Sequence, residues 1–543
     1  MSKSTVLPYA LDLGSLGQIE GLTLTSPTTS KSQCHYIGGL PYALPPIGPY
    51  RFRPPRPLPA HHRYGTRANP GRFACRTALC PQPTYGAAPE KAPWDEDCLQ
   101  LNIWIPAGEA PMNGWPVFFY IHGGWLQFGT ANTPPEVGAK LLSETTFEAV
   151  IVMPSYRLNA FGFLASKELE TEARENGESV GNMGFWDQRM ALEWTSRNIG
   201  RFGGNRDLIT VGGYSAGSHS AFQQLSHDLD RPKEEAIINR VIMWSNGTGV
   251  QAKFLPEAQE QFDELLGVLG IPLDCSAEEK LTKLRNVPAD RLVEVQSRLK
   301  ISEFRAVSDG AFVNKQKIES IEDGTFARKL KERGIKILNG ECAEEWNVYG
   351  SWRTPANSYE AVEIRLCADY PKKVVQKLMP IYFPAQRLPD KYKDWVDAFG
   401  KVYADLQVYA LERGLADRLT KGGLTVGKDL LRYRIEWRAK CIDTIVPPEW
   451  GVTHSTDMAI WFWGNGTGDG LTADEKRTLA PWTELFSRFV KGEDVQWPLK
   501  GPKSVLRLTV DGKTEMCEDH LWDHGLAIWK AVNGKGDRSQ AKL

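Results

Sequence analysis

The sequence predicts an α/β fold in which a central, mostly parallel and twisted sheet is covered by helices. Two observations predict it. Apolar, strand-like runs alternate along the chain with segments of helical spacing, and this alternation builds βαβ units and a parallel sheet. From about 255 to 300 and again from 370 to 422 the pattern turns helical with charged faces, which predicts helical insertions.

Each expected element follows from its apolar pattern. Short runs rich in β-branched and aromatic residues predict strands, whereas apolar residues three or four positions apart predict helices. Strands are expected at 99–105, 117–121, 149–153, 208–212, 336–338, 430–437 and 504–509. Helices are expected at 135–143, 183–198 and 216–229. No break in composition separates these elements, so a single domain is expected over residues 1–543.

The charge balance excludes several classes of partner. Lysine and arginine number 65 against 66 aspartate and glutamate, which leaves a net charge of -1 and no general field for nucleic acid or acidic membranes. No segment reaches the ~18 to 20 apolar residues of a membrane span, so no integral membrane segment is expected. No cysteine and histidine spacing resembles a zinc site, so neither a metal nor an organic cofactor is expected.

A candidate nucleophile lies between a strand and a helix. Residues 213–217 read GYSAG, which fits the G-x-S-x-G pattern directly after the strand LITVG and before a helical run. Such a sharp turn needs small neighbours and exposes its serine near the positive end of the next helix. The alternative is a chance turn of glycine and serine. In context the pattern predicts an α/β-hydrolase fold with Ser215 as nucleophile.

A second turn supplies candidate oxyanion donors. Residues 120–125 read YIHGGW and end the strand VFFYI with a glycine pair. Glycines there allow backbone N–H groups to point into a cavity, as an oxyanion hole requires. We assign the donors to the N–H groups of Gly124, Trp125 and Ala216. The alternative is a plain turn from strand to loop.

Several ordered motifs carry a family resemblance. They read GLPYA (39–43), RFRPP (51–55), EDCLQLN (96–102), SYRLN (155–159), GNMGFWDQ (181–188) and FGGN (202–205). Together they resemble the type-B carboxylesterase and cholinesterase-like family of serine esterases, in a fungal-type intracellular form. The resemblance covers most of the chain.

The resemblance implies the rest of a Ser-His-Glu triad. The segment GECAEE (340–345) is similar to the family segment that carries the acid, which places the acid at Glu345, with Glu344 as a competitor. The segment GVTH (451–454) is similar to the histidine segment and places the base at His454. The chain order Ser, acid, His is the order of the α/β-hydrolase fold. The implied mechanism proceeds through an acyl-enzyme.

This chain departs from the family pattern at two positions of the site. Trp125 stands where the family usually has a third glycine, so its indole is expected along the acyl pocket or, alternatively, in the core. Tyr214 stands where the family often has glutamate. We expect Trp125, Tyr214 and His122 around the substrate pocket.

The resemblance also allows one disulfide, between Cys80 and Cys98, although both would be thiols in a reducing compartment. The count of nine cysteines and the absence of a secretory h-region favour an intracellular, non-secreted protein. The sequence Ala541-Lys542-Leu543 resembles a peroxisomal address. The expected location is therefore cytoplasmic or peroxisomal.

The leading hypothesis is a serine carboxylic-ester hydrolase that acts on a small-molecule ester. The same triad can also serve thioester or lactone hydrolysis, acyl transfer or cyclisation in a biosynthetic pathway, because all of these use the same oxyanion chemistry. A remote alternative is a non-catalytic, cholinesterase-like recognition protein. Such proteins lose triad residues, whereas this chain has all three candidates.

Overall fold

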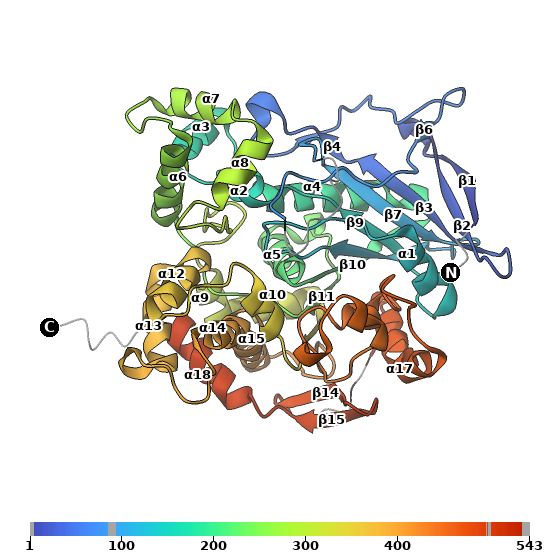
Figure 1. Ribbon diagram of the computed structural model, residues 1–543. Coiled ribbons are helices and arrows are strands. Elements are labelled where there is room, and N and C mark those ends of the chain that lie inside the picture. The colour runs from blue at the N-terminus through green and yellow to red at the C-terminus, as the bar shows by residue number, and fades with distance from the viewer. Residues whose placement is uncertain (1–4, 85–93, 496, 498–500, 535–543) are drawn as a thin grey trace.

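A computed structural model describes residues 5–84, 94–495, 497 and 501–534 (Figure 1). Most of its strands join one sheet, in the order β1-β2-β3-β7-β9-β8-β10-β11-β12-β13-β14-β15, with β6 paired to β2. The strands are β1 Thr5–Asp12, β2 Gln18–Thr25, β3 Ser32–Pro41, β4 Ala43–Leu44, β5 Arg56–Pro57, β6 Gly71–Arg72, β7 Gln100–Pro106, β8 Trp115–Ile121, β9 Val150–Pro154, β10 Gly204–Tyr214, β11 Arg240–Trp244, β12 Lys336–Cys342, β13 Leu430–Ile435, β14 Ser504–Leu508 and β15 Thr514–Glu518. The expected address at 541–543 lies outside the described residues.

The middle of the sheet is parallel and its ends are antiparallel. The pairings from β9 through β8, β10, β11, β12 and β13 to β14 are all parallel. Strands β1, β2, β3 and β7 pair antiparallel at one end, and β15 pairs antiparallel with β14 at the other. The predicted mostly parallel sheet is therefore confirmed, although the sequence patterns did not reveal the N-terminal antiparallel strands or β11.

Helices cover both faces of the sheet. Successive residues of a strand point to opposite faces, so a central strand contributes side chains to the core on each side. In β8, Val117, Phe119 and Ile121 join one buried core, whereas Phe118 and Tyr120 join the other. Helices α4 and α5 pack on the first face, and α1 and α17 pack on the second. The run VFFYI is apolar throughout because a central parallel strand has no face in water.

Six of the remaining helices lie in the two predicted helical regions. Helices α6 to α8 fall in the first expected helical region and α13 to α15 in the second (Figure 1). The helices are α1 Pro135–Glu144, α2 Asn159–Phe163, α3 Lys167–Asn176, α4 Met183–Asn198, α5 Ala216–Asp230, α6 Leu255–Leu269, α7 Ala277–Arg285, α8 Ala289–Gln296, α9 Lys317–Glu322, α10 Thr325–Arg333, α11 Trp346–Ser351, α12 Tyr359–Asp369, α13 Lys372–Tyr382, α14 Trp395–Ala404, α15 Ala410–Lys421, α16 Met458–Trp461, α17 Ala473–Val490 and α18 Trp522–Asn533.

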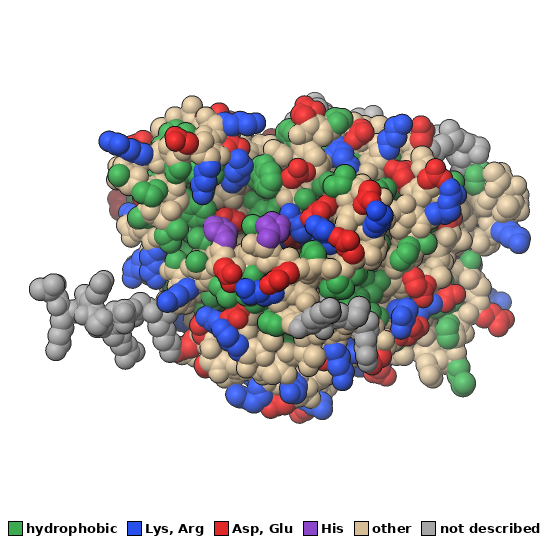
Figure 2. All heavy atoms as spheres, turned by 90° about the horizontal axis from the view of Figure 1, so that it is seen from below, with side chains coloured by type: hydrophobic (Ala, Val, Ile, Leu, Met, Phe, Trp, Pro, Cys, Tyr) green, Lys and Arg blue, Asp and Glu red, His purple; other side chains and the backbone are tan. Residues whose placement is uncertain are grey.

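The surface carries charges of both signs side by side. Figure 2 shows lysine, arginine, aspartate and glutamate interspersed over one face, without a field of a single sign. Within the described ranges, no helix is long and apolar enough to cross a membrane. The same part of the chain contains no group of three or more histidine, cysteine, aspartate or glutamate side chains arranged to hold a metal ion.

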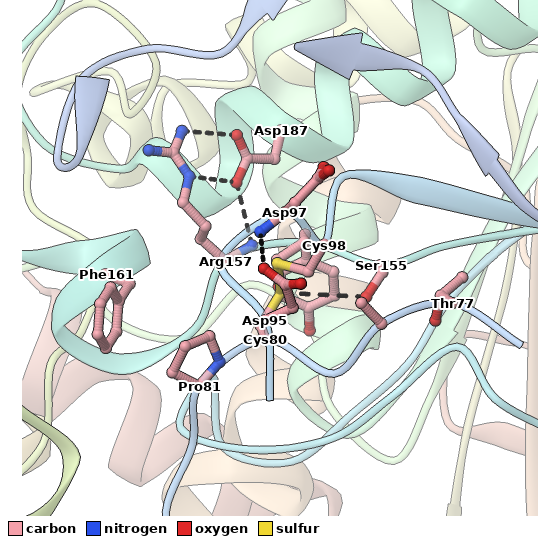
Figure 3. The surroundings of a disulfide bond; sticks show 12 residues. Thr77, Cys80, Pro81, Asp95, Asp97, Cys98, Ser155, Arg157, Phe161 and Asp187 are labelled. Carbon is pink, nitrogen blue, oxygen red and sulfur yellow. Dashed lines mark hydrogen bonds and ion pairs between the residues drawn. A yellow bond between two sulfur atoms is a disulfide. The ribbon is translucent and has the colours of Figure 1, made fainter. Parts of the chain in front are cut away.

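A disulfide joins the two cysteines that the family resemblance paired. Cys80 and Cys98 are both buried, and their Cα atoms are 5.4 Å apart. Figure 3 shows that the ion pair between Arg157 Nη2 and Asp187 Oδ1, 2.7 Å long, lies beside this bridge. The bridge and the ion pair therefore connect several of the family-like motifs in one buried region.

We predict that the oxidised protein, when denatured without reductant, shows seven reactive thiols, because two of its nine cysteines are bonded. Reductant should raise the count to nine. A loop of this length contributes about 3 kcal/mol to stability by restricting the unfolded chain. A count of nine without reductant on freshly purified protein would instead show that the bridge is absent.

Candidate active site

The candidate catalytic residues follow the carboxyl ends of neighbouring parallel strands. Ser215 follows β10, the loop that begins at His122 follows β8, and Glu345 lies three residues beyond β12. His454 lies in the long connection after β13. Because these strands run in the same direction, their carboxyl ends meet at one edge of the sheet, where α/β folds build their sites.

The turn at Ser215 is held in a strained conformation. Its φ is 58° and its ψ is -126°, and the residue caps the N-terminus of α5. A Cβ on Gly213 would lie 2.2 Å from the carbonyl oxygen of Gly217, and one on Gly217 would lie 2.0 Å from that of Ile121. Only glycine fits at both positions, so the G-x-S-x-G pattern follows from the close approach of these backbones.

Glu345, and not Glu344, faces the histidine. Oε2 of Glu345 lies 2.5 Å from Nδ1 of His454, and both side chains are buried. The second oxygen of Glu345 accepts the backbone N–H of Cys342 at 2.7 Å. Glu344 instead accepts the backbone N–H of Val452 at 2.5 Å. The geometry therefore decides between the two candidate acids.

Two tyrosine rings pack against the imidazole of His454. The ring centroid of Tyr349 lies 4.2 Å from it and that of Tyr214 lies 4.8 Å from it. Nε2 of His454 is buried and has no hydrogen-bond partner among the described residues. The ring is thus held at Nδ1 by the carboxylate and at its faces by tyrosines, while Nε2 stays available.

The predicted oxyanion loop lies against the nucleophile. A Cβ on Gly123 would come within 2.9 Å of Ser215 Cβ, and one on Gly124 would lie 1.9 Å from the carbonyl oxygen of Phe128. Gly124 has a φ of 111° and Trp125 a φ of 54°. Ala216 begins α5, so its N–H has no carbonyl one helical turn earlier to bond.

A cavity opens beside Ser215. Trp125, Ala216, His219 and Tyr349 line it together with the nucleophile. The Trp125 indole also stacks on Trp352, with ring centroids 5.5 Å apart, so it is both a wall of the cavity and part of an aromatic cluster.

Two of the three residues expected around the pocket, His122 and Tyr214, pack elsewhere. Among the described residues, the walls of the cavity include neither His122 nor Tyr214. His122 stacks on Tyr156, with centroids 4.4 Å apart, and burial lowers its pKa to about 4. Tyr214 packs against His454 instead. Both side chains point into packed surroundings because the turns that carry them direct the neighbouring residues, not these two, toward the cavity.

Comparisons with known proteins identify the family to which the chain belongs. A model of the carboxylesterase family matches residues 10–515. The chain belongs to the carboxylesterase family. A carboxylic ester hydrolase of Gibberella moniliformis is 54% identical over 527 residues, which cover 97% of this chain and 96% of that protein. An uncharacterized esterase/lipase of Schizosaccharomyces pombe is 37% identical, with 97% of each chain covered.

The crystal structure of Aspergillus niger EstA superimposes on this carboxylesterase with a TM-score of 0.74. The superposition covers 97% of this chain and 98% of that one, at 22% identity, and so bears on the fold alone. The predicted family, the α/β-hydrolase fold and the carboxylesterase-type enzyme are confirmed by these matches.

The motifs did not reveal the polar part of the cavity wall in this carboxylesterase. Lys253, Arg305, Asp369, Tyr370 and Gln407 all line it. They come from connections and helical insertions far apart in the sequence, with no shared spacing. Charged residues inside helical patterns indicate solvated faces by default, so no sequence signal distinguished these five.

One buried carboxylate near the triad gives a test of the site's electrostatics. Asp457 is fully buried and accepts a hydrogen bond from Trp461 Nε1 at 3.0 Å. Burial, and next the nearby charge of Glu345, raise its pKa from 3.8 to about 6. The folded protein therefore binds a proton between these values that the unfolded chain releases. Its free energy of unfolding falls as pH rises through this window.

We predict that Asp457→Asn, which carries no titratable group there, becomes progressively more stable relative to wild type between about pH 4 and pH 7. The difference should grow by about 2 to 3 kcal/mol, measured by urea unfolding at each pH. Asp207→Asn, the same change at an exposed position, should give no comparable trend. A difference that is constant with pH for Asp457→Asn would contradict the assignment.

Proposed function

We propose that this carboxylesterase hydrolyses carboxylic esters through Ser215, His454 and Glu345 and an acyl-enzyme intermediate. The observation that carries the proposal is the 2.5 Å contact between Glu345 and Nδ1 of His454, at the sheet edge where the strained Ser215 turn opens on a cavity. No step of this proposal needs a metal or an organic cofactor.

His454 acts as the base. Its Nε2 takes the hydroxyl proton as Ser215 Oγ attacks the ester carbonyl, and it later returns that proton to the departing alcohol. Glu345 fixes the tautomer of the ring, because its carboxylate accepts the Nδ1–H, and stabilises the imidazolium that forms. Water that is activated in the same way then releases the acid from Ser215.

The backbone N–H groups of Gly124, Trp125 and Ala216 stabilise the negative oxygen of the tetrahedral intermediate. The close approach of the glycine loop to Ser215 supports this assignment, as does the position of Ala216 at the start of α5. Removing one such donor from an enzyme typically costs about 3 kcal/mol of transition-state stabilisation.

We predict that wild-type protein releases nitrophenolate from p-nitrophenyl esters in a series from acetyl to dodecanoyl, and that Ser215→Ala lowers the rate by at least about 1,000-fold. The variant loses the attacking oxygen, so it should also lose any initial burst of nitrophenolate. Ser226→Ala, a change of the same kind in α5, should retain activity. Turnover that survives in Ser215→Ala would contradict the mechanism.

If wild type and Ser226→Ala both lack turnover and burst on these esters, ester hydrolysis is not the activity of this site. The same assay should then be repeated with thioesters and lactones, which need the same three residues and the same oxyanion donors.

We further predict that Trp125→Gly shifts the preferred acyl chain toward longer or bulkier groups, because the indole forms a wall of the cavity. Glycine tolerates the φ of 54° at this position, so the loop should keep its shape. Trp125→Phe keeps an aromatic wall and should stay closer to the wild-type profile. The measurement is kcat/KM across the same ester series, and an unchanged profile in Trp125→Gly would refute the role of the indole.

A further inference from the structure

We propose that the cavity beside Ser215 selects esters that carry a carboxylate, which it binds through Lys253 and Tyr370. The inference deepens the proposed ester hydrolysis and rests on it. It concerns the part of the substrate that lies away from the reacting carbonyl, and it starts from polar groups that the mechanism itself does not use.

Lys253 is a buried cation in the wall of the catalytic cavity. Its side chain lines the same cavity as Ser215, and the residue is 8% exposed. Its Nζ donates to the carbonyl oxygens of Cys367 at 2.9 Å and Ala368 at 2.7 Å. An ammonium group has three N–H bonds, and the described residues provide no acceptor for the third.

The buried carboxylates near this ammonium are paired with arginines. The nearest buried acid, Asp369, is held by Arg305 and Arg365. The other buried acid, Glu303, lies 3.2 Å from Arg353 and 3.7 Å from Arg305. Four cations, of which Arg305 and Arg353 are half-buried, thus share two buried carboxylates.

Glu257 adds a third carboxylate that acts on Lys253, but it is only half-buried. An excess of one positive charge therefore remains beside the cavity even when Glu257 is counted. A buried charge without a partner is costly, so a bound anion would compensate it.

A second donor lines the same cavity as this ammonium. The hydroxyl of Tyr370 accepts a hydrogen bond from Gln407 Nε2, and its own hydrogen has no acceptor among the described residues. Tyr370 lies three residues after Cys367 and two after Ala368, whose carbonyl oxygens accept hydrogen bonds from Lys253 Nζ. Lys253 and Tyr370 both line the cavity. The cavity wall therefore offers two hydrogen-bond donors, one of them charged, and a carboxylate accepts from a charged donor more strongly than a neutral oxygen does.

The remainder of the wall accommodates a short apolar spacer. Leu126, Val250, Ala306 and Pro371 are apolar residues of the same wall. The ligand that this wall fits is therefore an ester with an apolar segment that ends in a carboxylate, on either the acyl or the alcohol side of the scissile bond.

The test uses two matched substrate pairs, each differing by one carboxylate. On the acyl side, mono-4-nitrophenyl adipate is compared with 4-nitrophenyl hexanoate, after subtraction of spontaneous hydrolysis. On the alcohol side, 4-acetoxybenzoate is compared with its methyl ester. The readout is kcat/KM for wild type, Lys253→Met, Tyr370→Phe and the control Lys317→Met. Lys317 is also a buried lysine, but it bonds the carbonyl of Thr248 and does not line the cavity.

We expect wild type to prefer the anionic member of at least one pair. Lys253→Met should lower kcat/KM for that substrate by about 10- to 100-fold, and Tyr370→Phe should lower it by a smaller factor. Hydrolysis of the neutral member should persist in both variants, which shows that they are folded and active. Lys317→Met should keep the wild-type preference.

Two outcomes would overturn the proposal. In the first, wild type hydrolyses the neutral members but prefers the anionic member of neither pair. In the second, Lys317→Met reduces the preference as much as Lys253→Met, which would show a general field and no carboxylate site. Failure of wild type on all four substrates would instead argue against ester hydrolysis itself, so the two proposals fail by different results.

Discussion

The strained turn at Ser215 is the constraint on which the rest of the site depends. A residue with a φ of 58° at the junction of β10 and α5 persists only if the adjoining backbones pack tightly around it. Glycines at 213 and 217 make that packing possible, because β-carbons there would overlap neighbouring carbonyls. The same packing brings the glycine loop after β8 against the serine. One backbone constraint thus positions both Ser215 and the glycine loop to which we assign the oxyanion donors.

The parallel centre of the sheet brings distant parts of the chain to the site. Strands β8, β10 and β12 end at the same edge, so turns far apart in sequence meet there. Buried ion pairs brace the surrounding segments. Arg51 bonds Glu96, and Arg157 bonds Asp187, so each pair joins two of the family-like motifs. These motifs support the site structurally and do not touch the reacting atoms.

The helical insertions decide what the site accepts. Tyr349 from α11 packs against His454 and also lines the cavity, while Asp369 ends α12 and Tyr370 follows it. These residues, together with Lys253 and Arg305, form part of the polar wall of the cavity. The strands therefore position Ser215 and Glu345, whereas the insertions supply much of the wall that a substrate would meet.

The sequence by itself determined the fold class and the turn at Ser215, because apolar periodicity and glycine requirements are local properties that a linear pattern records. The segments of Glu345 and His454 came from the family resemblance. Tertiary structure alone decided that Glu345 and not Glu344 reaches His454, since the two residues differ only in the direction of their side chains. It also packs His122 against Tyr156 and Tyr214 against His454, and it places Lys253 and Tyr370 in the wall of one cavity. Such placements depend on how separate insertions pack against one another, and no spacing along the chain encodes that contact.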